Sequence, residues 1–204
     1  MIKALLFDFG RVITAQKPRS LFERYESELD LLPGTLNTIM FESPFWEKAL
    51  VGEINMQAYW QAIGPQLKLF TVAEVEAFKK RYYLDEKINS DVLKLLEMLY
   101  DKYQLAIVSN HPPGLQLWLK EWQIHGLFEQ IVCSGDEGVI KPNPAIFYIA
   151  LERLQVEPGE TIFIDDTKQH VIAAQALGMR ALHFTTAEKL LRDLGELGVV
   201  EYRA

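Results

Sequence analysis

Four short apolar segments of this sequence each end in polar groups that can do chemistry. In an open parallel sheet, ligands bind outside the carboxyl ends of the strands, so polar groups in these positions of neighbouring strands meet at one edge. The predicted site therefore combines three carboxylates, a hydroxyl and an ammonium group. The carboxylates are those of Asp8, Asp165 and Asp166, the hydroxyl is that of Ser109 and the ammonium group is that of Lys141. Asn110 and the residues Ser134 to Asp136 also stand at the ends of these segments.

Clustered carboxylates of this kind indicate metal-assisted phosphoryl chemistry. Three of them close together raise one another's pKa values unless a cation joins them. Oxygen ligands without a Cys or His cluster suit Mg²⁺ rather than Zn²⁺, and Mg²⁺ would also hold a phosphate oxygen. An ionised Asp8 could then attack phosphorus and form an aspartyl-phosphate. Ser109 and the backbone N–H groups after it would hold phosphate oxygens, and Lys141 would balance the negative charge.

Each of these residues also has a purely structural interpretation. A single Asp at a strand end is more often a turn or helix-cap residue, and Asp165 and Asp166 could cap the helix that follows them. Ser109 and Asn110 could form a simple turn, and Lys141 could be a solvated loop residue. The four motifs in this order favour the catalytic interpretation over the structural one.

The segments that must position these groups alternate between strand and helix patterns. Near-continuous apolar runs of this length are typical of strands buried on both faces. Helical patterns separate the later runs, which predicts an α/β, doubly wound, Rossmann-like parallel sheet. The predicted strands are 2–7, 105–110, 130–134, 161–166 and, more weakly, 180–184. The predicted helices are 88–103, 114–123, 145–154, 167–178 and 187–197.

Residues 15–87 break this alternation. They show helical patterns punctuated by Pro and Gly, with no convincing strand. A helical block directly after the first strand predicts a cap over the site. We therefore expect a core of residues 1–14 and 88–204 and a cap of residues 15–87.

The composition excludes several classes of partner. The chain of 204 residues is 49% hydrophobic and has a formal net charge of −7, which argues against nonspecific binding to nucleic acid or to an acidic membrane. No apolar stretch is long enough to span a bilayer, and no signal peptide is evident. With one cysteine, Cys133, no internal disulfide is possible. We expect a cytoplasmic protein, monomeric or homodimeric, that acts on a small phosphorylated metabolite.

The order "FDFGRV … IVSN … KPNPAIF … IDD" resembles the haloacid dehalogenase-like (HAD) hydrolase superfamily over essentially the whole chain. The resemblance implies that Asp8 is the nucleophile, Ser109 the phosphate-binding hydroxyl and Lys141 the charge-balancing lysine. It implies that Asp8, the Gly10 carbonyl, Asp165 and Asp166 hold Mg²⁺, with Asp166 direct and Asp165 through water. The insertion resembles the small helical C1 cap. Its "GEI" stretch is similar to the subgroup of glucose-1-phosphatase and the N-terminal phosphatase domain of epoxide hydrolases.

Two residues depart from the family pattern. Phosphatases of the superfamily usually carry an acid/base Asp two residues after the nucleophile, where this chain has Gly10. Glycine permits close backbone approach and positive φ, but it cannot transfer a proton. The last motif often has Asn where this chain has His170. His111 follows the phosphate-binding pair and could take the acid/base role, or it could be a loop histidine without one.

The remaining predicted substrate contacts are Asn110, Arg11, Phe45, Trp46 and Lys48. Arg11 neighbours the nucleophile, and it could contact substrate or face solvent. Phe45, Trp46 and Lys48 lie in "ESPFWEK", which follows a break in the cap and could face the site. Tyr59 and Trp60 we assign instead to the core of the cap itself.

The leading interpretation is a Mg²⁺-dependent phosphatase acting on a small phosphomonoester such as a sugar phosphate or a nucleotide. One alternative is a 2-haloacid dehalogenase, whose family also lacks the second acid but needs no metal, so the Asp165–Asp166 pair argues against it. The other alternative is a catalytically degenerate binding protein, for which Gly10 is the main support.

Overall fold

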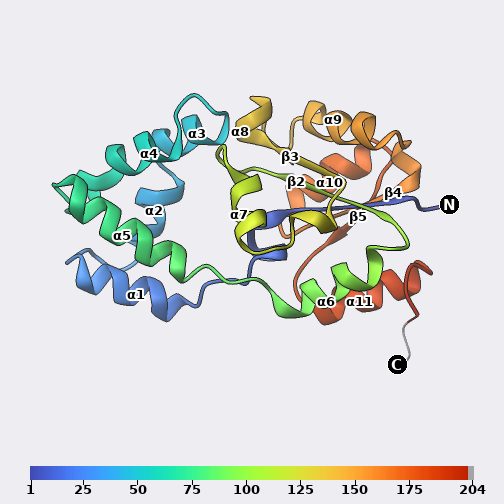
Figure 1. Ribbon diagram of the computed structural model, residues 1–204, viewed down its shortest axis with the longest axis horizontal. Coiled ribbons are helices and arrows are strands. Elements are labelled where there is room, and N and C mark those ends of the chain that lie inside the picture. Colours follow the sequence, from blue (N-terminus) through green and yellow to red (C-terminus); the bar gives the residue numbers. More distant parts are fainter. Residues whose placement is uncertain (202–204) are drawn as a thin grey trace.

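The protein is built on a five-stranded parallel sheet (Figure 1). The computed structural model describes residues 1–201. The strand order is β3-β2-β1-β4-β5, so β1 is central and the chain winds outward on both sides of it. The predicted doubly wound class is thereby confirmed. The strands are β1 (Ala4–Phe7), β2 (Gln104–Ser109), β3 (Gln130–Cys133), β4 (Thr161–Asp165) and β5 (Arg180–His183).

Helices cover both faces of the sheet, because successive strand side chains point to opposite faces. In β1, Leu5 and Phe7 enter a core shared with α6, α7 and α11, whereas Ala4 and Leu6 enter a second core under α9 and α10. None of the helices within residues 1–201 is long and apolar enough to cross a membrane. The core helices are α6 (Ser90–Leu99), α7 (Leu115–Glu121), α8 (Ser134–Glu137), α9 (Pro144–Leu154), α10 (Lys168–Ala176) and α11 (Ala187–Glu196), with short turns η1 (Phe9–Ile13), η3 (His125–Leu127) and η4 (Pro158–Glu160).

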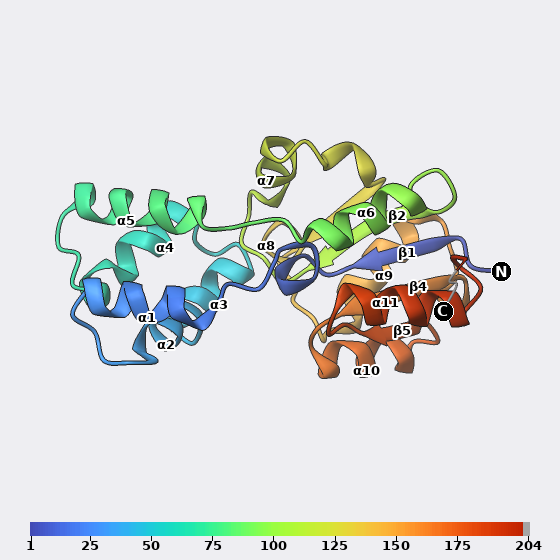
Figure 2. The same cartoon turned by 90° about the horizontal axis from the view of Figure 1, so that it is seen from below.

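A helical unit lies beyond the carboxyl ends of the strands, at the left of Figure 1 and Figure 2. It has its own hydrophobic cluster, in which Tyr25, Tyr59, Trp60 and Phe78 are buried and pack against one another's rings. We propose that residues 15–87 form this cap. Its elements are α1 (Arg19–Glu28), α2 (Thr35–Phe41), α3 (Pro44–Leu50), α4 (Met56–Ile63), η2 (Gly64–Leu67) and α5 (Val72–Leu84).

The chain passes between core and cap twice, and the two crossings are joined to each other. Thr14 and Ile88 form an isolated antiparallel bridge, and the Asn89 N–H donates to the Ile13 carbonyl at 2.8 Å. The two linkers therefore run side by side at the base of the cap.

Most element boundaries fall within one or two residues of those predicted from the sequence. The first strand begins at Ala4 rather than Ile2, and the helix predicted over 88–103 spans Ser90–Leu99. Gly178 ends the α10 region with a φ of +87°, which is the left-handed conformation expected of a glycine at a helix end. The last three residues of the predicted core, 202–204, lie outside the described residues.

The protein should lose much of its stability when a side chain buried between the sheet and its covering helices is truncated. Ile107 in β2 is fully buried, so we expect Ile107→Ala to lower the free energy of unfolding by about 2–5 kcal/mol. Ile172 on α10 is 63% exposed, so Ile172→Ala serves as the matched control and should change it by less than about 0.5 kcal/mol. Urea unfolding followed by circular dichroism measures both; equal losses would contradict the assignment.

Candidate active site

The backbone of the sheet places the three predicted carboxylates together. Asp8 directly follows β1, and its N–H donates to the Ile164 carbonyl of β4 at 2.8 Å. Asp165 is the last residue of β4, and its carbonyl accepts from Phe184 N–H at 2.9 Å. Asp8, Asp165 and Asp166 each present an oxygen within 4.8 Å of the others. The parallel pairing of β1 and β4 thus creates the cluster.

A buried lysine joins two of these carboxylates. Lys141 Nζ lies 2.8 Å from Asp8 Oδ1 and 2.6 Å from Asp165 Oδ2, and its side chain is fully buried. Burial alone would lower the pKa of the ammonium group, but the charges of Asp8 and Asp165 outweigh this effect and raise it. Lys141 is therefore charged, and it partly neutralises the cluster.

The side-chain amide of Asn110 holds the loop that carries Lys141. Asn110 Oδ1 accepts from the Lys141 N–H at 2.7 Å, and Asn110 Nδ2 donates to the Lys141 carbonyl at 2.9 Å. We predicted Asn110 as a substrate contact, and the structure shows its amide binding the backbone of another site residue. Ser109, the preceding residue, is buried at the carboxyl end of β2.

Asp165 and Asp166 differ in how much of each carboxylate is engaged. Asp165 is fully buried and accepts from Lys141 Nζ on Oδ2 and from the Thr167 N–H on Oδ1. His170 Nδ1 lies 3.0 Å from Asp165 Oδ2 and 3.2 Å from Oδ1. Burial alone would raise the pKa of Asp165, but the hydrogen bond from His170 and the charge of Lys141 overcome this effect and lower it. Both of its oxygens are thus occupied by donors of the protein.

Asp166 is only partly buried and is held more loosely. Arg11 Nε lies 2.9 Å from its Oδ2, and the Thr167 hydroxyl donates to its Oδ1 at a long 3.3 Å. Its carbonyl lies 2.9 Å from His183 Nε2. Burial raises the pKa of the Asp166 carboxyl group, and although Arg11 opposes the change, Asp8 and Asp165 add to it. A bound cation would remove this penalty, which makes Asp166 the more available ligand of the pair.

Gly10 and Arg11 lie in the turn η1, which directly follows Asp8. Gly10 has a φ of −66° and a ψ of 128°, a conformation that any residue adopts, and a Cβ built on it would meet no atom within 4 Å. Positive φ, which we considered for Gly10, occurs instead at Arg11, with a φ of 58°. The turn is closed by the Arg11 N–H, which donates to Thr14 Oγ1 at 2.8 Å. Neither the backbone conformation nor the space around the Cβ position therefore requires glycine at position 10.

His111 is fixed by its backbone and its ring. Its N–H donates to Ser134 Oγ at 3.0 Å, and its ring meets Phe9 edge-on with 5.6 Å between ring centroids. Burial lowers the pKa of His111, so the imidazole is neutral at pH 7. His111 Nδ1 lies 2.7 Å from the Pro112 carbonyl, which can only accept. Nδ1 therefore carries the hydrogen, and Nε2 keeps its lone pair.

Cap and core contact each other near Ser134, through one hydrogen bond and one close approach of two glycines. Ser134 Oγ donates to the Leu50 carbonyl of the cap at 2.6 Å while accepting from His111. A Cβ on Gly52, whose φ is +75°, would lie 2.2 Å from the Gly135 carbonyl oxygen. Gly52 belongs to the "GEI" stretch, and its contact with Gly135 was not predicted from the sequence. The glycines in "VGEI" and "CSGD" were its only visible signal.

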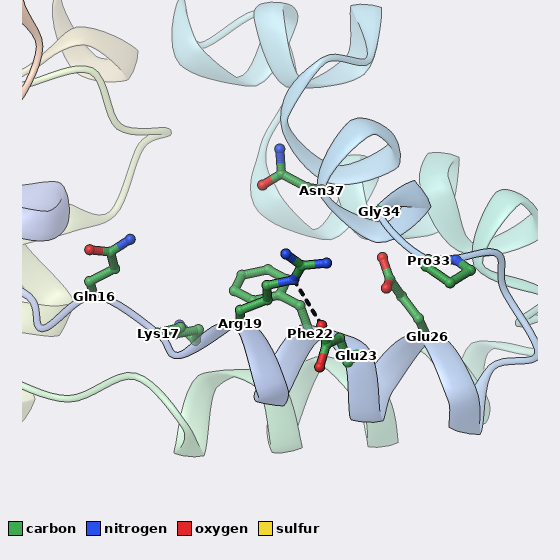
Figure 3. Close-up of a pocket in the computed structure, with 9 residues that line it drawn as sticks. All are labelled: Gln16, Lys17, Arg19, Phe22, Glu23, Glu26, Pro33, Gly34 and Asn37. Carbon is green, nitrogen blue, oxygen red and sulfur yellow. Dashed lines mark hydrogen bonds and ion pairs between the residues drawn. The ribbon is translucent and has the colours of Figure 1, made fainter.

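The cap residues predicted to face the site have mixed surroundings. Phe45 and Trp46 pack against the cap's own cluster, where Trp46 meets Phe41 and Tyr59. Lys48 is exposed on α3. Their role as substrate contacts stays a prediction. A separate pocket of about 370 Å³ lies between α1 and the start of α2, and Figure 3 shows the residues that line it. It contains none of the residues predicted for the site.

The donor set of the site fits a hard divalent cation. It consists of carboxylate oxygens, and Mg²⁺ prefers oxygen ligands. Asp8 keeps its Oδ2 free of the lysine, because Lys141 bonds Oδ1. Asp8 and Asp166 are therefore the side chains suited to direct ligation, and Asp165 is suited to an indirect role.

Fold and site together define an enzyme class. The chain belongs to the haloacid dehalogenase-like hydrolase family, whose model matches residues 48–184. It is 28% identical over 200 residues to a sesquiterpene phosphatase of Aspergillus oryzae, with 96% of each chain covered. It is 32% identical over 128 residues to a phosphoglycolate phosphatase of Haemophilus influenzae, covering 58% of this chain and 57% of that protein.

Solved structures agree with this assignment at the level of the fold. A HAD family enzyme from Bacteroides thetaiotaomicron, crystallised with magnesium and inorganic phosphate, superposes with a TM-score of 0.73 at 21% identity. The match covers 91% of this chain and 95% of that one. The resemblance seen in the sequence motifs is thereby confirmed.

The contact between Gly52 and Gly135 should be sensitive to a single methyl group. We expect Gly52→Ala to destabilise the protein by about 1–3 kcal/mol more than Gly138→Ala, because a side chain there overlaps backbone atoms. Gly138 also has a positive φ, +71°, but it has open space around its Cβ position. Gly138→Ala therefore measures the free-energy cost of the strained backbone conformation without an overlap of atoms. Urea unfolding of the two variants provides the measurement, and equal losses would show that the cap does not rest on this contact.

Proposed function

We propose that this protein is a Mg²⁺-dependent phosphatase that hydrolyses a small phosphomonoester through an aspartyl-phosphate on Asp8. The observation that carries the proposal is the cluster of Asp8, Asp165 and Asp166 around the buried ammonium group of Lys141. The phosphatase names of the two relatives described above support it, as does the magnesium and phosphate of the Bacteroides enzyme.

Asp8 is the nucleophile in this proposal. Lys141 holds the Asp8 carboxylate through Oδ1, and one oxygen of that carboxylate bonds to phosphorus. The bond from phosphorus to the ester oxygen breaks, and the leaving alcohol takes up a proton. Water then hydrolyses the aspartyl-phosphate to release phosphate and restore the carboxylate.

The cation site would use Asp8, the Gly10 carbonyl and Asp166, with Asp165 acting through water. Mg²⁺ bound there would supply positive charge that offsets the negative charge of the carboxylates and of a phosphate oxygen. The chain's own residues do the remaining positioning. Asp165, engaged by His170 and the Thr167 N–H, fixes Lys141 from the side opposite Asp8. The Ser109 hydroxyl holds phosphate oxygens, whereas the His111 N–H is already bonded to Ser134 Oγ.

His111 is the residue suited to the proton transfer that Gly10 cannot perform. Its Nε2 has a lone pair, because Nδ1 is committed to the Pro112 carbonyl. In the fraction of molecules in which Nε2 is protonated, His111 gives that proton to the leaving oxygen. The neutral imidazole that results then takes a proton from the attacking water, which restores the protonated form. We therefore propose His111 as the acid/base residue.

The nucleophile can be tested directly. We expect Asp8→Asn to lower the turnover of p-nitrophenyl phosphate with Mg²⁺ by about 10³-fold or more, because the amide is a poor nucleophile. Asp101→Asn is the matched control, since that exposed carboxylate lies in the turn before β2, at the end of the sheet away from the cluster. Absence of turnover by the wild type with Mg²⁺, Mn²⁺ or Co²⁺ would favour the binding-protein alternative. Metal-independent release of chloride from 2-chloropropionate would favour the dehalogenase.

The acid/base role can be tested with two leaving groups. We expect His111→Gln to slow hydrolysis of 2-hydroxyethyl phosphate about 10²-fold, and to slow that of p-nitrophenyl phosphate much less, because nitrophenolate leaves without a proton. Gly10→Asp should fit its open position and restore the rate on the alkyl ester in the His111→Gln background. An unchanged ratio of the two rates in His111→Gln, measured from initial rates of phosphate release, refutes the assignment.

A further inference from the structure

Arg11 is a cation held at the edge of the proposed site. Its Nε lies 2.9 Å from Asp166 Oδ2, and Asp166 in turn presents an oxygen within 4.8 Å of one from Asp8. The guanidinium group is therefore separated from the nucleophile by a single carboxylate. Its left-handed backbone, with a φ of 58°, and its N–H bond to Thr14 Oγ1 set the direction in which it leaves the turn.

The end of the Arg11 side chain is available for a ligand. Its side chain is 62% exposed, and within residues 1–201 its terminal Nη groups make no hydrogen bond. Guanidinium groups bind carboxylates and phosphates through two parallel N–H bonds, which a lysine cannot reproduce. Arg11 is thus tethered by one nitrogen and presents the others to solvent.

The neighbouring cations are already committed. Lys141 is buried between Asp8 and Asp165, so it serves the nucleophile. Arg19, near the linker, pairs with Glu23 at 2.8 Å on α1, as the dashed line in Figure 3 shows. Lys17 pairs with Glu86. Arg11 differs from Arg19 and Lys17 in that its partner, Asp166, is itself a carboxylate of the proposed site, so its unbonded Nη groups lie at the edge of that site.

We infer that Arg11 binds a second anionic group on the substrate, so that the preferred substrates are phosphomonoesters whose leaving group carries a carboxylate or another phosphate. This inference rests on the proposed function. The transferred phosphoryl group is served by Ser109, Lys141 and the cation site, so the guanidinium is left for the other end of the molecule. In a chain with a net charge of −7, such an arginine also offsets the repulsion of a doubly anionic substrate.

Matched pairs of substrates test the inference. One pair is 2-phosphoglycolate and 2-hydroxyethyl phosphate, which differ in the carboxylate. The other is propane-1,3-diol bisphosphate and its monophosphate, which differ in the second phosphate. We expect kcat/KM of the wild type to favour the more anionic member of at least one pair by about 10- to 100-fold, the range of a charge-assisted hydrogen bond. The pair with the larger ratio identifies the anion.

Variants of Arg11 separate this role from a structural one. In Arg11→Gln the ratio should fall toward one, and in Arg11→Lys it should be partly retained. Arg192→Gln, on the exposed face of α11, is the control and should keep the wild-type ratio. Mn²⁺ binding, followed by electron paramagnetic resonance, reports whether Asp166 still serves the cation. Equal loss on both members of each pair, or an unchanged ratio in Arg11→Gln, overturns the inference.

Failure of the proposed function gives a different result. If no ester is hydrolysed, the same pairs are compared by calorimetric binding to the wild type and to Arg11→Gln. Arg11-dependent preference for the more anionic ligand then supports the inference without catalysis. Equal affinity for the members of both pairs overturns it as well.

Discussion

The buried ammonium group of Lys141 is the interaction on which the site depends. Asp8 and Asp165 arrive from neighbouring strands with their carboxylates close together, and such a pair is unstable without a counter-charge. A lysine with a fully buried side chain is equally unstable without anions. Each charge is therefore tolerated because the other is present. Removing either partner would leave a buried charge unpaired, which typically costs about 3–5 kcal/mol.

This mutual dependence explains why so much of the surrounding structure is devoted to placement. Asn110 fixes the backbone of Lys141, and His170 and Thr167 fix Asp165. These contacts come from the segments that follow β2 and β4, with His170 on α10. The two strands lie on either side of β1, so these segments flank Asp8. The parallel sheet is thus the element that turns separate loops into one rigid constellation.

The sequence allowed the sheet, the helical insertion and the charged cluster to be predicted, because each leaves a local pattern. Buried parallel strands read as apolar runs, and their polar ends identify the edge where groups converge. The contacts of Asn110, His170 and Ser134 could not be predicted in this way. Asn110 reads as a turn residue or a ligand contact, and only the fold reveals that its amide meets the backbone of Lys141 31 residues away. Gly10 is a case in which the sequence suggested too much. A glycine at that position allows a positive φ, but the structure gives Gly10 an ordinary backbone conformation.

The backbone contact of Gly52 with Gly135 has a mechanical consequence for the cap. The cap is joined to the core at the paired linkers near Thr14 and Ile88. It touches the core again at this glycine contact and where Tyr83 of α5 meets Trp118 of α7, with 5.0 Å between ring centroids. A rigid-body movement of the cap about the linkers would therefore have to break at least one of these contacts. Leu50 and His111 are joined through the Ser134 hydroxyl beside the glycine contact. A movement that opened this contact would also disturb the hydrogen bonds that hold the His111 backbone.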